Sequence, residues 1–191
     1  MTTADFLKRL CEGYVRSYRT LNLRTEAKWT DLTQRELHFV VQLGEMLGFA
    51  ARLEAQRMDR SWHDLDSQEL VLHLERETEA GRVLNETLSK LLRPEGSRQA
   101  RYLAAVLGWV REEDVPAIKQ KIAEELEARP LLLIAWVGPT KEEAKRLDAF
   151  VFSGSEVHTR RGEGETDGVG YWYAWFSEEW KLEEVSGAAP A

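Results

Sequence analysis

The chain lacks features on which several protein classes depend. Cys11 is the one cysteine among 191 residues, which excludes an internal disulfide and a zinc site built from several cysteines. The longest apolar runs, such as residues 131–137, have the length of a strand and are too short to cross a bilayer. The first residues contain no uninterrupted apolar segment of the kind that a secretory signal requires. These absences predict a cytoplasmic protein without membrane segments.

An excess of basic charge is also missing. The 26 lysines and arginines are outnumbered by 33 acidic residues, which gives a net charge of −7. This balance argues against a protein that coats nucleic acid through charge alone. The acidity is uneven, because residues 153–191 carry eight acidic and three basic side chains, whereas residues 50–111 carry ten of each.

The remaining composition is that of a globular protein. Hydrophobic residues make up 43% of the chain and charged residues 31%, which suits a domain of ordinary size with a real core. We expect one α/β domain over residues 1–184 and a flexible tail of small residues over 185–191.

The spacing of apolar residues predicts alternating helices and strands. Helices are expected over 4–21, from Asp31 or Thr33 to Leu47 with Gly48 as the stop signal, and over 83–92, 115–128 and 141–147. Strands are expected over 69–77, 102–110, 131–137, 149–152 and 171–176, after an interrupted extended stretch over 49–63 that is either two strands or one bent strand. Residues 162–170 are expected to form a mobile hairpin tip. This order predicts a mixed β-sheet flanked by helices, with an N-terminal helix and a C-terminal β-hairpin.

The most informative segment is RMDRSWHDLDSQELVLHLERE, residues 57–77. Asp59 opens a short extended run, and after a turn the second strand carries Glu75 and Glu77 on one face, because strand side chains alternate. Like charges this close repel one another unless they are solvated, protonated or bound to a cation. The segment therefore indicates either a metal site or a solvated acidic strand face.

Together with REL at 35–37 and GF at 48–49, this segment resembles the PD-(D/E)XK nuclease superfamily, the restriction-endonuclease-like fold. The resemblance covers about residues 32–110 and implies a nuclease-like core over about 32–137: a helix, antiparallel strands, a second helix and a further strand. It implies a divalent-metal-dependent nuclease in which Asp59, Glu75 and Glu77 bind Mg²⁺ or Mn²⁺ and nucleic acid is the substrate. Glu36, on the first helix of that core, would add a ligand or an outer contact.

One position departs from the family pattern. Glu77 occupies the place of the lysine that helps to activate the attacking water, and Arg76 should point to the opposite face of the strand. Lys90, on the following helix, is the candidate replacement, and an ion pair with Glu86 four residues earlier is its alternative role. The departure leaves a second hypothesis open: a catalytically inactive nuclease-fold domain that serves as a binding or interaction module.

His73 lies on the same strand face as Glu75, where a hydrogen-bonded, partly buried histidine is a commoner role than a proton relay. The arginines beside the loop after residue 92 fit scattered surface charge better than phosphate contacts; they are Arg93, Arg98 and Arg101. The C-terminal aromatic residues indicate a homodimer surface; they are Trp172, Trp175 and Trp180.

Overall fold

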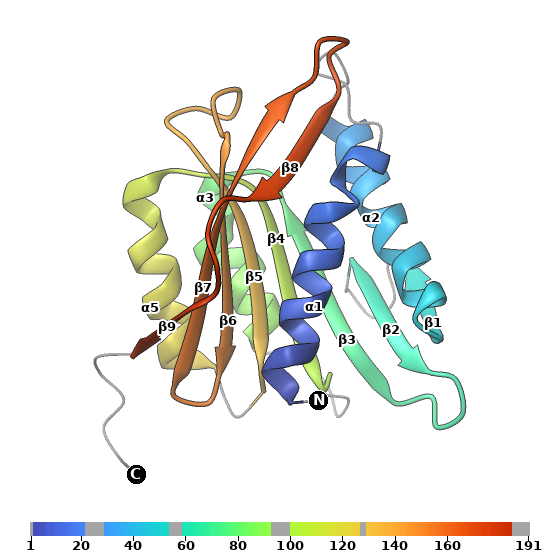
Figure 1. Ribbon diagram of the computed structural model, residues 1–191. Helices are drawn as coiled ribbons and strands as arrows, with labels where there is room; N and C mark the ends of the chain where they lie inside the picture. Colours follow the sequence, from blue (N-terminus) through green and yellow to red (C-terminus); the bar gives the residue numbers. More distant parts are fainter. Residues whose placement is uncertain (1, 22–28, 54–58, 93–99, 127–128, 185–191) are drawn as a thin grey trace.

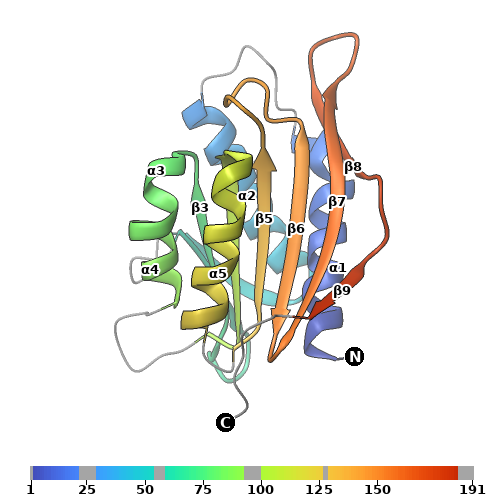
Figure 2. The ribbon, with the colours of Figure 1, turned by 90° about the vertical axis from the view of Figure 1, so that its left-hand side faces the viewer.

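The computed structural model describes residues 2–21, 29–53, 59–92, 100–126 and 129–184. These residues form nine strands in one open, mixed sheet, with helices on both of its faces (Figures 1 and 2). The predicted α/β class, with a mixed sheet flanked by helices, is therefore confirmed.

The helical segments are α1 (Thr3–Arg16), a 3₁₀ turn (Tyr18–Leu21), α2 (Trp29–Met46), α3 (Ala80–Arg82), a π-helical turn (Val83–Thr87), α4 (Leu88–Leu92), a second 3₁₀ turn (Glu112–Asp114) and α5 (Val115–Glu125). The strands are β1 (Phe49–Leu53), β2 (Arg60–Asp64), β3 (Leu70–Glu77), β4 (Tyr102–Val110), β5 (Leu131–Val137), β6 (Arg146–Ser153), β7 (Glu156–Thr166), β8 (Trp172–Phe176) and β9 (Lys181–Glu184).

The strands lie in the order β1 to β8, and β9 shares one edge of β7 with β8. The pairs β3–β4 and β4–β5 are parallel, and the other pairs are antiparallel. Along β7, β8 pairs with residues 162–166 and β9 with residues 156–159.

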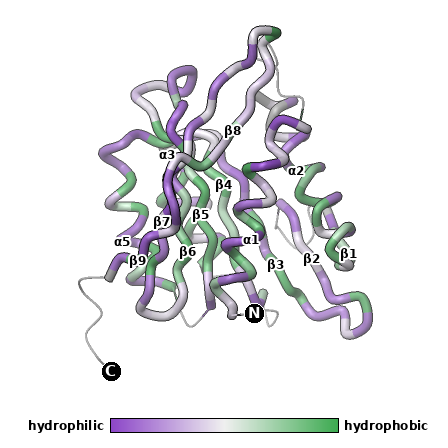
Figure 3. Tube along the Cα trace, viewed as in Figure 1, coloured by the Kyte–Doolittle hydropathy of each residue, from purple (hydrophilic) through white to green (hydrophobic). Residues whose placement is uncertain are grey.

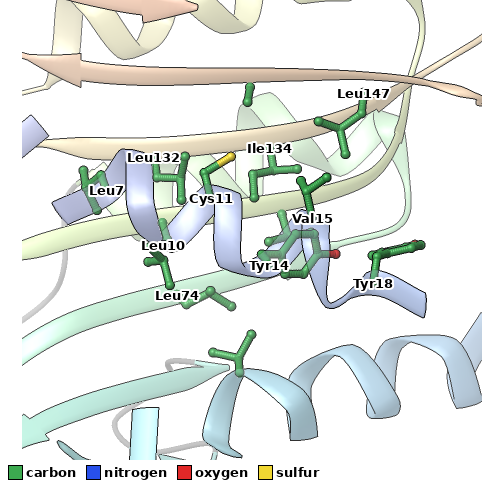
Figure 4. Close-up of a cluster of buried hydrophobic side chains, with 14 of the residues drawn as sticks. Leu7, Leu10, Cys11, Tyr14, Val15, Tyr18, Leu74, Leu132, Ile134 and Leu147 are labelled. Atoms are coloured by element: carbon green, nitrogen blue, oxygen red, sulfur yellow. The ribbon is translucent and has the colours of Figure 1, made fainter. Parts of the chain in front are cut away.

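Two hydrophobic layers attach the helices to the sheet. The layer under α1 and α2 includes Leu7, Cys11, Tyr14, Leu74, Leu132, Ile134 and Leu147 (Figure 4). The layer under α4 and α5 includes Leu88, Leu91, Leu103, Ile118, Ile122 and Leu133. Side chains of β4 and β5 alternate between the two faces of the sheet, and helices cover both faces. Both strands are therefore apolar along most of their length, as Figure 3 shows.

Several predicted boundaries hold. The strand predicted over 131–137 is β5, and the strand predicted over 102–110 is β4. The extended stretch over 49–63 contains two antiparallel strands, β1 and β2, rather than one bent strand. Helix α2 begins at Trp29, earlier than predicted, and Gly48 follows its end with a φ of 85°, a conformation that favours glycine.

The helix predicted over 141–147 is wrong. Residues 139–143 form bends and turns, and β6 already begins at Arg146. The chain folds back so tightly after β5 that a Cβ on Gly138 would lie 2.6 Å from the carbonyl oxygen of Glu143. Packing at the end of the strand thus overrides the helical propensity of the Lys-Glu-Glu sequence.

The loop predicted over 162–170 is also wrong for its first half. Residues 162–166 belong to β7 and pair with β8, and residues 162 and 163 also pair with β6. The glycines there serve close packing rather than a turn: a Cβ on Gly162 would lie 2.5 Å from the Trp175 carbonyl oxygen, and one on Gly164 would lie 2.5 Å from the Trp136 ring. Strand β9 was not predicted.

The flexible tail predicted over 185–191 lies outside the described residues. Within the described part of the chain, every helix is too short or too polar to span a membrane.

Candidate functional site

The site lies where the start of β2 meets the end of β3. In the antiparallel pair, Ser61 is opposite His73 and Arg60 is opposite Leu74, so Asp59, just before β2, reaches Glu75. The Asp59 N–H lies 3.4 Å from Oε1 of Glu75. The backbone N–H of Arg76 donates to Oδ2 of Asp59 at 2.8 Å, which fixes the direction of this carboxylate. The strand register therefore brings two of the predicted acids together.

Lys90, on α4, joins both acids. Its Nζ lies 2.6 Å from Oε2 of Glu75 and 3.9 Å from Oδ1 of Asp59. The Lys90 side chain is 37% exposed and that of Asp59 31%, whereas that of Glu75 is only 4% exposed. The group is therefore buried at Glu75 and open to solvent at its other two members.

The alternative role of Lys90, an ion pair with Glu86, is not the one observed. Glu86 lies in the π-helical turn and its carboxylate is 3.9 Å from Arg82. A π-helical turn places successive side chains at a different angle from an α-helix, so the spacing of four residues no longer aligns Glu86 with Lys90.

A buried histidine holds the other oxygen of Glu75. Nε2 of His73 lies 2.6 Å from Oε1 of Glu75, and His73 is 2% exposed. On the neighbouring strand, Oγ of buried Ser61 lies 3.1 Å from Nε2 of His63. His73 is thus hydrogen-bonded, as predicted, and more deeply buried than expected.

Glu77 has a different set of contacts. Its Oε1 accepts the backbone N–H groups of Thr78 and Glu79 at 2.7 and 2.8 Å, and its Oε2 accepts the hydroxyl of Thr87 at 3.1 Å. Oε1 therefore holds the turn that leads into α3, and Oε2 holds the π-helical turn. Among the described residues, no group of three or more His, Cys, Asp or Glu side chains is placed to hold a metal ion.

Glu36 lies on the opposite face of the sheet, 1% exposed. Its Oε2 accepts Nε of Arg76 at 2.6 Å, and its Oε1 accepts the hydroxyls of Tyr14 at 2.7 Å and Tyr18 at 3.3 Å. Arg76 points away from Glu75, as predicted from strand alternation. Glu36 thus reaches the site only indirectly, through Arg76, whose backbone N–H holds Asp59.

The charges of the buried Glu36–Arg76 ion pair are well compensated. Burial and the nearby Glu36 carboxylate raise the pKa of the Tyr14 and Tyr18 hydroxyls well above the usual range. Burial lowers the pKa of Arg76, but the Glu36 carboxylate more than offsets this, so that the pKa is raised overall. Both tyrosines therefore remain neutral donors, and Arg76 remains charged.

Lys141 was not identified from the sequence. Burial and the positive charge of Arg76 lower its pKa, and the carboxylates of Glu77 and Glu79 oppose the shift. The turn after β5 thus adds a lysine near the end of β3. No local pattern signals this, because Lys141 follows Glu77 by more than sixty residues.

The remaining predicted residues fall elsewhere. Arg101 forms an exposed ion pair with Glu69 at 3.3 Å, consistent with surface charge, and the other two arginines, Arg93 and Arg98, lie outside the described residues. In the C-terminal aromatic group, Trp175 is 36% exposed and stacks on Tyr173 with a centroid distance of 5.3 Å. The homodimer surface stays a prediction.

Comparison of the chain with protein-family models, with curated proteins and with solved structures gives no match.

The environment of Asp59 predicts a pH dependence of stability. Burial, followed by repulsion from Glu75, raises the pKa of Asp59 above its ordinary value of 3.8. The folded state therefore binds a proton that the unfolded state has already lost, and stability falls as pH rises from 3.8 through the raised pKa. Asp59→Asn should therefore gain stability relative to wild type as the pH rises through this range. Urea unfolding in the presence of EDTA measures the difference.

Asp64 is the matched control. Hydrogen bonds from the backbone N–H and the hydroxyl of Ser67 lower its pKa, so its contribution is present above the ordinary value and is lost as pH falls. Asp64→Asn should therefore lose stability relative to wild type as pH rises. The same trend in both variants would contradict the assignment.

Proposed function

We propose that the protein is a divalent-metal-dependent nuclease that hydrolyses phosphodiester bonds of nucleic acid. The observation that carries the proposal is the meeting of Asp59, Glu75 and Lys90 at the end of β3. The order of α2, β1–β3, α3–α4 and β4 also agrees with the helix–strands–helix–strand core that the sequence resembles. In this proposal Lys90 has the role of the family's lysine, whose usual position in the sequence is occupied by Glu77.

The donor set suits a hard cation. Mg²⁺ takes oxygen ligands and is bound by one or two carboxylates while it keeps several waters, and Asp59 and Glu75 supply two carboxylates. Because Asp59 is partly exposed, solvent and a substrate phosphate can reach this position. When bound, a divalent ion polarises the phosphate and lowers the pKa of a bound water. Glu77 is not a member of this ligand set, because it holds the turn into α3.

The chain's own residues have separate roles in this proposal. His73 occupies Oε1 of Glu75 and leaves Oε2 to Lys90. The Arg76 N–H keeps Oδ2 of Asp59 in place. Lys90, displaced from Glu75 by the cation, would offer its N–H groups to the attacking water or to a phosphate oxygen.

Metal binding is tested first. Thermal melts with Mg²⁺ or Mn²⁺ should show a stabilisation of about 2.7 kcal/mol at a hundredfold excess over the dissociation constant, and Glu75→Gln should abolish it. The control Glu86→Gln, on the exposed side of the π-helical turn, should respond as wild type does. Cleavage of single-stranded, duplex and branched substrates should depend on the metal and on Glu75.

The inactive binding module is the second candidate, and one observation favours it. The ammonium of Lys90 already compensates Glu75 without a metal ion, as expected where chemistry has been lost and charge balance kept. In that case the melts should be unchanged by either metal in wild type and Glu75→Gln alike, and no substrate should be cleaved.

A further inference from the structure

Helices α1 and α2 cover the same face of the sheet (Figure 1). An apolar pocket is lined by residues of α1, of the C-terminal part of α2 and the residue after it, and of the start of β1. Its volume is about 450 Å³, and its walls are formed by Phe6, Leu10, Leu43, Leu47 and Phe49. The volume falls within the range of about 300–1,000 Å³ that is usual for small-molecule sites.

The pocket follows from how the helices pack. Helix α1 rests on β5, β6 and β8, whereas α2 rests on β1 and β2, so the two helices diverge across a wide sheet. Neighbouring rings support two of the walls. The ring centroids of Phe6 and Tyr102 lie 4.5 Å apart, and those of the stacked Phe49 and Trp62 rings lie 5.6 Å apart. Such supported side chains give the pocket a fixed shape in the absence of a ligand.

A glycine keeps the pocket open. Gly13, near the end of α1, lines it, and a Cβ at this position would meet nothing within 4 Å. Glycine in a helix costs about 0.5–1 kcal/mol relative to alanine. Helix α1 therefore has a destabilising residue at a position where a larger side chain would enter the pocket.

One charged residue, Arg9, completes the lining. It is exposed, and among the described residues none forms an ion pair or a hydrogen bond with it. A guanidinium matches a carboxylate through two parallel hydrogen bonds. A single arginine beside apolar walls is complementary to one negative charge on an apolar body.

We propose that this pocket binds a small monocarboxylate amphiphile, with the hydrocarbon chain between α1 and α2 and the carboxylate against Arg9. The proposal is independent of the nuclease proposal, because none of the pocket residues belongs to that site.

The test is calorimetric titration of the whole protein with decanoate and with decanol. Wild type should bind decanoate more tightly than decanol. Arg9→Gln should weaken decanoate binding about fivefold and leave decanol binding unchanged, as expected for loss of one exposed charge pair. Arg16→Gln is the matched control, because Arg16 is an exposed arginine of the same helix that does not line the pocket.

Gly13→Leu separates binding from folding. The leucine should occupy the pocket and abolish binding of both probes, while the melting temperature stays equal to that of wild type or rises. Equal binding of the two probes, no effect of Arg9→Gln, or unchanged binding by a folded Gly13→Leu protein would overturn the proposal. So would a wild-type dimer that Gly13→Leu dissociates, since the pocket would then serve self-association.

Discussion

Replacing Glu36 with alanine should lower the free energy of unfolding by about 3–5 kcal/mol, because it leaves the charge of Arg76 buried without its partner. The Arg76 side chain is 3% exposed, and its guanidinium lies against Gly108, so water has little access to it. Tyr14 and Tyr18 would lose their acceptor in the same change. Urea unfolding at neutral pH measures the loss.

Two further variants test whether the loss of stability comes from the unpaired charge of Arg76. The double change Glu36→Leu with Arg76→Met should recover the part of the loss that comes from the unpaired charge of Arg76, since removing both charges of a buried pair is often neutral. The cost of leaving the Tyr14 and Tyr18 hydroxyls without an acceptor should remain. Glu86→Ala, at an exposed carboxylate, should change stability by less than about 0.5 kcal/mol. A cost below about 1 kcal/mol for Glu36→Ala would show that water or a rearranged side chain replaces the carboxylate.

Lys90→Met should reduce metal-dependent hydrolysis by about a hundredfold or more, the usual contribution of a positioned group that acts on the attacking water. The same change should tighten Mg²⁺ binding, because the ammonium at 2.6 Å from Glu75 competes with a cation for the same oxygen. Opposite effects on metal affinity and on turnover distinguish a residue acting on water from a metal ligand. This prediction rests on the proposed nuclease function.

The matched control is Lys121→Met, which removes a lysine from an i, i+4 ion pair with Glu125 on α5. It should change neither quantity. If Lys90→Met retained full hydrolysis, Lys90 would not act on the attacking water, and that role would be contradicted.

Alternation along β3 was enough to predict, from the sequence, that Glu75 and Arg76 lie on opposite faces. Similarly, the uninterrupted apolar run over 131–137 predicted β5, because a strand covered on both faces needs no polar positions. Such features depend on local periodicity, which the sequence displays directly.

Glu36 and Glu77 show where this reasoning stops. The sequence predicted the helix that carries Glu36 but not the face of the sheet that this helix covers. Whether Glu36 meets Glu75 or Arg76 depends on which face of the sheet α2 covers. Glu77 shares a strand face with Glu75, yet the turn after β3 brings two donors to its oxygens and the π-helical turn brings a third. Contacts made by turns and by layer choice are tertiary, and no periodicity encodes them.

The division of one edge of β7 between two strands limits how this sheet can grow. Strand β8 covers residues 162–166 and β9 covers 156–159, while the N–H groups of Ser177 and Glu178 donate to the carbonyl oxygen of Arg161 between them. The longest strand is therefore covered along most of this edge and offers little of it to another chain. Among the described strands, a molecule that added by strand pairing would have to start on β1, β8 or β9, none longer than five residues. Short outer strands template filaments poorly, so the arrangement protects the protein against edge-to-edge aggregation.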